Sequence, residues 1–315
     1  MADRPILTLT LNPALDLATH VAEVQAGPKL RCAAPMVNPG GGGLNVSRAL
    51  LQLGIPSQAL VALGGPTGAA LRALLQEAGL TFTALASPGD TRQSLAVTDD
   101  STGAQYRFVL PGPVWQTADL AQVLQDIAQH AQIDGLAVLS GSLPPGLAPD
   151  TLAQIAAALP GMALVLDSSG ASLAHAVANP IPGLAVLRMD SDEAACLAGH
   201  PLPSAQHSAD LASALVAKGV AATVIIARGA EGNVLARAGQ RLLARPPAVP
   251  VVSAIGAGDS FVAGLLAAMA KGADWPAALT QGTAAATAAV MTPATDLCRG
   301  EDVARLLPQV TLSTL

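Results

Sequence analysis

Residues 256–259 read Gly-Ala-Gly-Asp and precede an aliphatic run that is typical of a buried helix. Gly256 and Gly258 permit a tight turn whose backbone N–H groups converge on an anion at the positive end of the helix dipole. Asp259 adds a carboxylate beside this anion site, where it can take the proton of an attacking hydroxyl group. The alternative is that Asp259 only caps the helix. We predict that Gly256, Ala257, Gly258 and Asp259 form a catalytic turn.

Four consecutive glycines, residues 40–43, precede a second helix-like segment. Their backbone can approach a ligand closely, and the free N–H groups at the start of the helix can bind its oxygen atoms. The alternative is a flexible hinge. The segment is not a dinucleotide-binding fingerprint, because Val46 stands where G-x-G-x-x-G needs its third glycine. Val262 excludes an esterase elbow around Ser260 in the same way.

Asp190 and Glu193 follow a strand-like run and are three residues apart. On the first turn of a helix both carboxylates share one face, so they could hold Mg²⁺ directly or through water. The alternative is that they only complement the helix dipole.

Cations are sparse, yet four of them fall in two neighbouring segments of the predicted architecture. These are Lys29, Arg31, Arg92 and Arg107. Arginine suits two-pronged contact with phosphate, so the group indicates an anionic substrate. The alternative is that these charges are merely solvated.

Strand-like and helix-like runs alternate along the chain, which predicts one α/β domain over residues 1–315 with a mostly parallel sheet and helices on both faces. The strand-like runs are 6–11, 58–63, 136–139, 163–166, 184–187 and 223–226, and the helix-like runs are 44–53, 68–78, 149–159, 171–178, 190–198, 209–218 and 258–271.

Two segments interrupt this alternation, at about residues 15–35 and 91–112. Both read as extended chain, and residues 99–103 form a turn-rich connection. Because both leave the same half of the fold, we expect them to form a small antiparallel β lid over the carboxyl edge of the sheet, where open α/β folds bind ligands.

Composition excludes several classes of protein. The 16 Lys+Arg and 22 Asp+Glu give a net charge of -6, so the basic excess that binds nucleic acid is absent. No apolar stretch approaches the ~18 residues that a membrane helix needs. Three widely separated cysteines form no disulfide framework or zinc signature. We therefore expect a cytoplasmic protein with no nucleic-acid partner and no membrane partner.

Taken together, these motifs resemble the PfkB group of ribokinase-like carbohydrate kinases over essentially the whole chain. The likeness is greatest to the minor, type II 6-phosphofructokinases of bacteria, and tagatose-6-phosphate kinases and 1-phosphofructokinases are also similar. The matching segments are residues 29–32, 39–45, 91–93, 105–109, 140–146, 167–170 and the Gly-Ala-Gly-Asp turn. The resemblance implies ATP-dependent phosphorylation of a ketohexose phosphate, with fructose 6-phosphate going to fructose 1,6-bisphosphate. The alternatives are the tagatose 6-phosphate and fructose 1-phosphate reactions, and a non-catalytic sensor of sugar phosphate or nucleotide.

The resemblance also implies roles for individual residues. Asp259 would be the base, and residues 256–258 would stabilise the transferring phosphoryl group. A homodimer through the lids, Mg²⁺ with the ATP and a bound K⁺ would be expected, and Lys29 could also serve an inhibitory ATP site. The implied contacts are Asp16, Gly41, Gly42 and Asn45 for the sugar; Lys29, Arg92 and Ser142 for its phosphate; Arg188, Asp190, Ala227 and Gly229 for the ATP phosphates; Gly258, Thr283 and Thr287 for the adenine; and Ser253 and Ile255 for K⁺.

Two departures from the family pattern concern the nucleotide. Relatives commonly read Lys-Pro-Asn where this chain reads Arg188-Met189-Asp190. The added negative charge at Asp190 is tolerable if Mg²⁺ lies between it and the phosphates, and repulsive otherwise. Ala227 stands where close relatives have serine, which removes a hydroxyl group that could touch phosphate.

Overall fold

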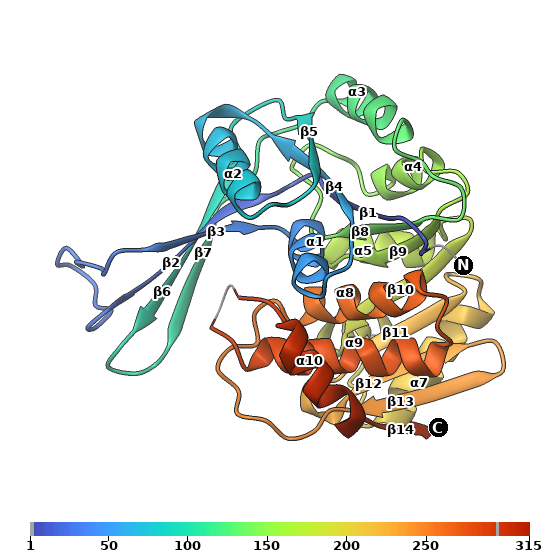
Figure 1. Ribbon diagram of the computed structural model, residues 1–315. Coiled ribbons are helices and arrows are strands. Elements are labelled where there is room, and N and C mark those ends of the chain that lie inside the picture. Colours follow the sequence, from blue (N-terminus) through green and yellow to red (C-terminus); the bar gives the residue numbers. More distant parts are fainter. Residues whose placement is uncertain (1–2, 294–295) are drawn as a thin grey trace.

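The computed structural model describes residues 3–293 and 296–315, and a ten-stranded sheet runs through them (Figure 1). From β11 to β5 the strands pair in parallel, whereas β12, β13 and β14 extend the sheet in antiparallel fashion. The strand order is β14 (Thr311–Thr314), β13 (Gln240–Arg245), β12 (Asn233–Arg237), β11 (Thr223–Ala227), β10 (Leu184–Asp190), β9 (Ala163–Asp167), β8 (Leu136–Ser140), β1 (Ile6–Thr10), β4 (Gln58–Leu63) and β5 (Phe82–Ala86).

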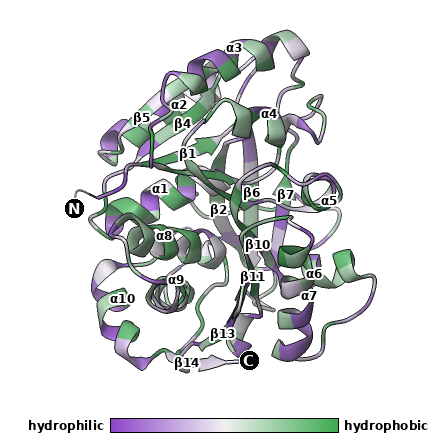
Figure 2. Ribbon diagram, turned by 90° about the vertical axis from the view of Figure 1, so that its right-hand side faces the viewer, coloured by the Kyte–Doolittle hydropathy of each residue, from purple (hydrophilic) through white to green (hydrophobic). Residues whose placement is uncertain are grey.

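Helices cover both faces of this sheet, as predicted, because parallel strands are buried on both sides. Along β1, Ile6 packs into one helical layer, and Leu7 and Leu9 pack into the other. Figure 2 shows the two layers on either side of the sheet. The first layer holds α1 (Gly42–Gln52), α2 (Gly65–Glu77), α8 (Ala257–Ala270), α9 (Trp275–Val290) and α10 (Gly300–Leu306), and the second holds α3 (Thr117–Ala128), α4 (Thr151–Ala157), α5 (Gly170–Ala178), α6 (Ser191–Ala198) and α7 (Ala205–Ala217).

A second, four-stranded sheet projects from the body in Figure 1, in the order β3 (Met36–Gly40), β2 (Ala14–Val21), β6 (Arg92–Asp99) and β7 (Gln105–Val109). We call it the lid. Its two outer pairs are antiparallel, as expected. The central pair, β2 with β6, is parallel instead. The reason is topological, because both strands start at the carboxyl edge of the main sheet, β2 soon after β1 and β6 soon after β5.

One helix of the first layer, α8, carries the Gly-Ala-Gly-Asp turn at its start. Ten of its fourteen residues are buried. The helix packs against α9 and α1, so its N-terminus is held firmly at the carboxyl edge of the sheet. Among the described residues, no helix is both long and apolar enough to cross a membrane.

Candidate active site

The predicted catalytic turn lies at the N-terminus of α8. Gly256 caps the helix with φ of 75°, a left-handed conformation that favours glycine. Asp259 occupies the first turn of the helix and accepts a hydrogen bond from Nδ2 of Asn45, with the two atoms 3.0 Å apart. Asn45 lies in the first turn of α1, immediately after the glycine run. Two motifs that are 214 residues apart in the sequence therefore meet at one carboxylate.

The Asp259 carboxylate is partly exposed and yet closely surrounded by protein atoms. Burial raises the pKa of Asp259 to about 7, and the neighbouring charge of Asp167 acts in the same direction. The hydrogen bond from Asn45 and the charges of Arg188 and Arg48 oppose this rise. A carboxyl group with a pKa near neutrality is well matched to proton transfer, since it can take a proton readily and release it afterwards.

Arg188 brings a positive charge to the same turn. Its Nη1 donates to Oδ1 of Asp167 at 3.0 Å, and both side chains are largely buried at the ends of β10 and β9. A Cβ atom on Gly258 would lie only 3.1 Å from Nη1 and Nη2 of Arg188. Gly258 thus allows the guanidinium group to lie against the turn. Nε of Arg188 is buried and finds no hydrogen-bond partner among the described residues.

The sugar residues implied by the family resemblance gather at the root of the lid. Asp16 lies on β2, and a Cβ atom on Gly40 would overlap its carboxylate. Burial raises the pKa of Asp16, whereas a hydrogen bond with Ser94 and the charge of Arg92 counteract the rise. Arg92 is half-buried, and its Nε donates to the backbone oxygen of Asn12 at 3.2 Å.

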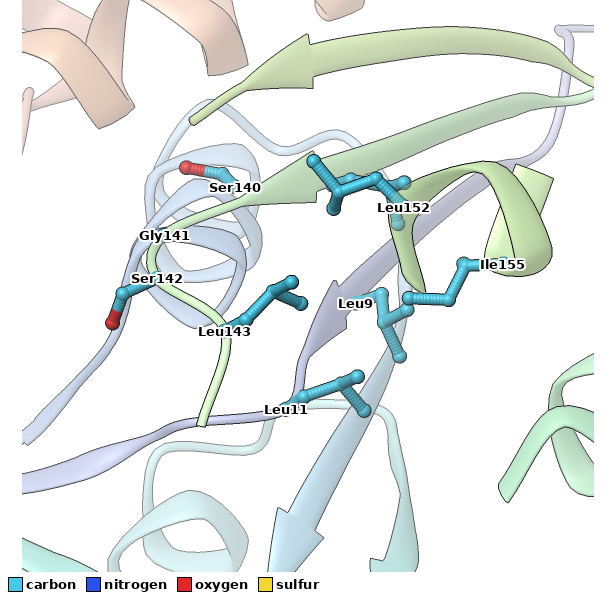
Figure 3. A pocket seen from close by; sticks show the side chains of 9 residues that line it. Leu9, Leu11, Ser140, Gly141, Ser142, Leu143, Leu152 and Ile155 are labelled. Atoms are coloured by element: carbon cyan, nitrogen blue, oxygen red, sulfur yellow. The ribbon is translucent and has the colours of Figure 1, made fainter. Parts of the chain in front are cut away.

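Ser142 joins this group through Asn12, whose Nδ2 donates to the Ser142 hydroxyl at 3.2 Å. Figure 3 shows Ser140 at the end of β8 and Ser142 just after it, with both hydroxyl groups directed away from the leucines of a small pocket. Gly41 caps α1 with φ of 118°, and a Cβ atom on Gly42 would overlap the Ser140 side chain. Both predicted glycines therefore lie beside the strand end that carries the serines.

Lys29 is not brought to this group within a single chain. It is exposed in the loop between β2 and β3 at the far end of the lid, whereas Asp16 and Arg92 lie at the lid's root. Its predicted contact with the sugar phosphate would require a lid movement or a second chain.

Asp190 and Glu193 form a capping box at the start of α6. Oδ1 of Asp190 accepts hydrogen bonds from the N–H groups of Asp192 and Glu193, and Oε2 of Glu193 accepts one from the N–H of Asp190. One oxygen of each carboxylate therefore serves the helix cap, in line with the alternative that these residues only stabilise the helix. This arrangement also gives the negative charge of Asp190 a partner in the helix dipole, which reduces the expected repulsion of phosphate.

No three His, Cys, Asp or Glu side chains gather into a metal-binding set among residues 3–293 and 296–315. Mg²⁺ usually keeps several waters and needs only one or two carboxylates from a protein. The second oxygens of Asp190 and Glu193 accept none of the capping hydrogen bonds and suit such an indirect role.

The remaining predicted nucleotide and cation contacts lie at the end of β11, in α9 and in the loop before α8. Ala227 ends β11, and Gly229 begins a short 3₁₀ turn two residues later. Thr283 and Thr287 are buried in α9, where each hydroxyl donates to a carbonyl oxygen of the preceding turn. Ser253 and Ile255 lie in the loop before α8, and the Ser253 hydroxyl accepts from the N–H of Ile255 at 3.1 Å.

Sequence reasoning assigned no role to Asp167 or Arg48, although both act on Asp259. Each had a weak signal. Asp167 follows a buried strand, and parallel strands present their carboxyl ends at one edge. Arg48 is three residues after Asn45 and so shares its helix face.

The sequence is similar to those of known carbohydrate kinases. The pattern of the pfkB family carbohydrate kinases matches residues 9–301. The chain is 38% identical over 304 residues to the ATP-dependent 6-phosphofructokinase isozyme 2 of Mycobacterium tuberculosis, covering 95% of this chain and 88% of that protein. It is 33% identical over 308 residues to a 1-phosphofructokinase of Xanthomonas campestris, covering 96% and 94%.

The fold also matches solved structures of phosphofructokinase-2 from Escherichia coli. These include a complex with fructose-6-phosphate, a complex with potassium and a tetrameric inhibited form, with TM-scores of 0.90, 0.91 and 0.90. Identity is 32% in each case, and the match covers 97% of this chain and 99% of the other.

Proposed function

The chain belongs to the pfkB family of carbohydrate kinases, and from this membership we propose that it transfers the γ-phosphoryl group of ATP to fructose 6-phosphate. The acceptor is the free primary hydroxyl group, and the products are ADP and fructose 1,6-bisphosphate. The observation that carries the proposal is the Asp259 carboxylate, held by Asn45 at the mouth of α8 beside the backbone amides of the turn. Relatives named as 6-phosphofructokinases support the choice of substrate.

Asp259 acts as the base in this mechanism. Its carboxylate accepts the hydroxyl proton while the sugar oxygen bonds to the γ-phosphorus and the bond from that phosphorus to the departing ADP oxygen breaks. Negative charge then spreads over the transferring group, where the amides of residues 256–258 and the Arg188 guanidinium group oppose it. These donors are in place before the reaction, because Asp167 already fixes Arg188.

The sugar is recognised at the root of the lid. Asp16 accepts hydrogen bonds from sugar hydroxyl groups, and the glycine run lets backbone approach the ring. Arg92 and Ser142 hold the 6-phosphate, since a guanidinium fork and a hydroxyl group both complement phosphate oxygens. Lys29 adds a third contact when the lid or a second chain carries it to the site. The lid excludes water, which would otherwise compete as the acceptor.

The ATP phosphates lie near Arg188, Asp190, Ala227 and Gly229, and the adenine lies beside Gly258 and α9. When bound, Mg²⁺ would supply neutralisation of the negative charge on the phosphates. Asp190 and Glu193 would hold it, directly or through water. Ser253 and Ile255 would hold K⁺, a proposal supported by the potassium complex of the E. coli protein.

In the proposed assembly two chains associate through their lids. Exposed apolar side chains on the lid support this association. On β7, Phe108 and Val109 are 53% and 61% exposed, and Leu110 directly after the strand is similarly open to solvent. Exposed apolar side chains gathered on one element mark a protein interface. Lid pairing also covers the site from water.

A second candidate substrate is fructose 1-phosphate, which the 33% identity to a named 1-phosphofructokinase supports. Tagatose 6-phosphate differs from fructose 6-phosphate only at one ring hydroxyl and is a further alternative. We would compare kcat/KM for the three ketose phosphates with saturating MgATP. The proposal expects fructose 6-phosphate to give the highest value, and a clear preference for either of the others would replace it.

A further inference from the structure

Arg48 is the only arginine of α1, and it lies one turn after Asn45 on the same face of the helix. The side chain is half-buried. Its Nη1 donates to the backbone oxygen of Pro39 at 2.9 Å and to the side-chain oxygen of Asn45 at 3.2 Å. Since Pro39 belongs to β3, Arg48 connects the root of the lid with the residue that contacts Asp259.

The hydrogen bond from Arg48 fixes the orientation of the Asn45 side-chain amide. An asparagine amide has one oxygen that accepts and one NH₂ group that donates, whereas arginine only donates. Arg48 therefore requires the oxygen of Asn45 to face it. This leaves the NH₂ group pointing to Asp259, where Nδ2 lies 3.0 Å from Oδ2. Without Arg48, the amide can also rotate by half a turn and accept a hydrogen bond from protonated Asp259, which stabilises the acid form over the ionised form.

We propose that Arg48 is a positioning residue, which orients the Asn45 amide and so keeps Asp259 in the ionised, hydrogen-bonded form that accepts the substrate proton. This inference rests on the proposed function, because it assumes that Asp259 is the base of a sugar kinase. It adds a residue that acts through Asn45.

The charges around Asp259 give the sign of the expected effect. The charged groups that face it are Asp167 from β9, Arg188 from β10 and Arg48 from α1. Asp167 raises the pKa of Asp259, and the two arginines lower it. Loss of Arg48 removes one positive charge and frees the Asn45 amide, and both changes favour the protonated acid. The acid limb of the pH profile should then move to higher pH.

The test compares Arg48→Met with wild type and with Arg72→Met, a control at an exposed arginine on α2. We would measure kcat/KM from about pH 6 to about pH 9, where an acid limb near neutrality is visible. Arg48→Met should move this limb upward by at least ~0.5 pH unit, so its loss of activity is greater at low pH than at high pH. Arg72→Met should follow wild type. An equal loss at every pH, with the limb in place, would overturn the proposal.

A double-mutant cycle with Asn45→Leu tests whether Arg48 acts through Asn45. If it does, the double variant should lose little more activity than Asn45→Leu alone, because residues that act as a unit are strongly non-additive. Losses that multiply would contradict the proposed relay.

Circular dichroism and the melting temperature would show whether each variant folds. If Arg48→Met does not fold, Arg48→Lys decides the matter. Lysine keeps the charge, but its rotating ammonium group lacks the fixed planar N–H directions with which Nη1 of Arg48 bonds both Pro39 and Asn45. Arg48→Lys should lower kcat and should shift the acid limb of the pH profile by less than the ~0.5 pH unit expected for Arg48→Met. An unchanged kcat would overturn the proposal. All assays use the ketose phosphate that wild type phosphorylates fastest, so a wrong choice of sugar would refute the proposed substrate without affecting this test.

Discussion

Asp259 depends on residues that the sequence separates widely. The Gly-Ala-Gly-Asp turn and the glycine run could each be identified from residue types, because both combine glycines with the start of a helix. Their meeting at the Asn45–Asp259 hydrogen bond could not be predicted from spacing. Asp167 and Arg48 were overlooked for the same reason. Each lies on another element, and only the packing of β9 and α1 brings it to the carboxylate.

The requirement for glycine at position 258 can be tested by adding a methyl group there. In Gly258→Ala the new Cβ atom would press on the Arg188 guanidinium group from 3.1 Å and displace it from the turn. Removal of one donor to a developing charge typically costs roughly 10²-fold in kcat, and we expect a loss approaching this size. Steady-state kinetics would measure it.

Arg188→Lys combined with Gly258→Ala provides the control, because the slimmer lysine side chain leaves room for the added methyl group. The double variant should recover part of the lost kcat. A Gly258→Ala variant with wild-type kcat would show that the contact with Arg188 does not matter for turnover.

Among the secondary-structure elements, the parallel strands were the most predictable. The six that were predicted read as short, mostly apolar runs, which are typical of a strand buried on both faces. The seventh, β5, was missed, because threonine interrupts its apolar residues. The α9 helix was not predicted, because its alanine-rich sequence shows little amphipathic periodicity. The antiparallel extension by β12–β14 was also missed. The parallel pairing of β2 with β6 depends on where the two strands leave the main sheet, which local patterns do not encode.

Substitutions at Asp190 can separate its contribution to the stability of the fold from its proposed support of Mg²⁺. Asp190→Asn keeps a good N-cap, so the free energy of unfolding should stay within a few tenths of a kcal/mol, whereas Asp190→Ala should lose about 0.5–2 kcal/mol. Urea denaturation measures both. If the carboxylate supports Mg²⁺ through water, both variants should also need more Mg²⁺ for half-maximal activity.

Ser204→Ala is the matched control, since Ser204 caps α7 by accepting a hydrogen bond from the N–H of His207. It should lose stability comparably and leave the Mg²⁺ dependence unchanged. An unaltered Mg²⁺ dependence in both Asp190 variants would restrict Asp190 to capping.

In the molecule as a whole, the lid is the part whose proposed role needs a second chain. It projects from the body in Figure 1 and carries exposed apolar side chains, whereas Lys29 lies at its far end. Pairing of two lids would cover the apolar surface and bring charged residues of one chain toward the other. In the proposed dimer, the lid would therefore link assembly to the completeness of the site.

This leads to a prediction about mass in solution. Light scattering at micromolar concentration should give twice the 31.3 kDa chain mass for wild type. Phe108→Asp should give the single-chain mass, because it would bury a charge in the lid interface. Ile133→Asp, at an 83% exposed position on the body, should leave the assembly intact. A single-chain mass for wild type would refute the lid-to-lid dimer.

The carboxylate of Asp259 is the centre of the account, and ADP release tests it most directly. We would measure kcat/KM against pH for wild type and Asp259→Asn with MgATP and fructose 6-phosphate. Wild type should gain activity as pH rises through about 7, since the base works only when it is ionised. Asp259→Asn should be slower by roughly 10²–10⁴-fold and should lose this rise. Equal rates in the two proteins, whether both active or both null, would contradict a catalytic role for Asp259.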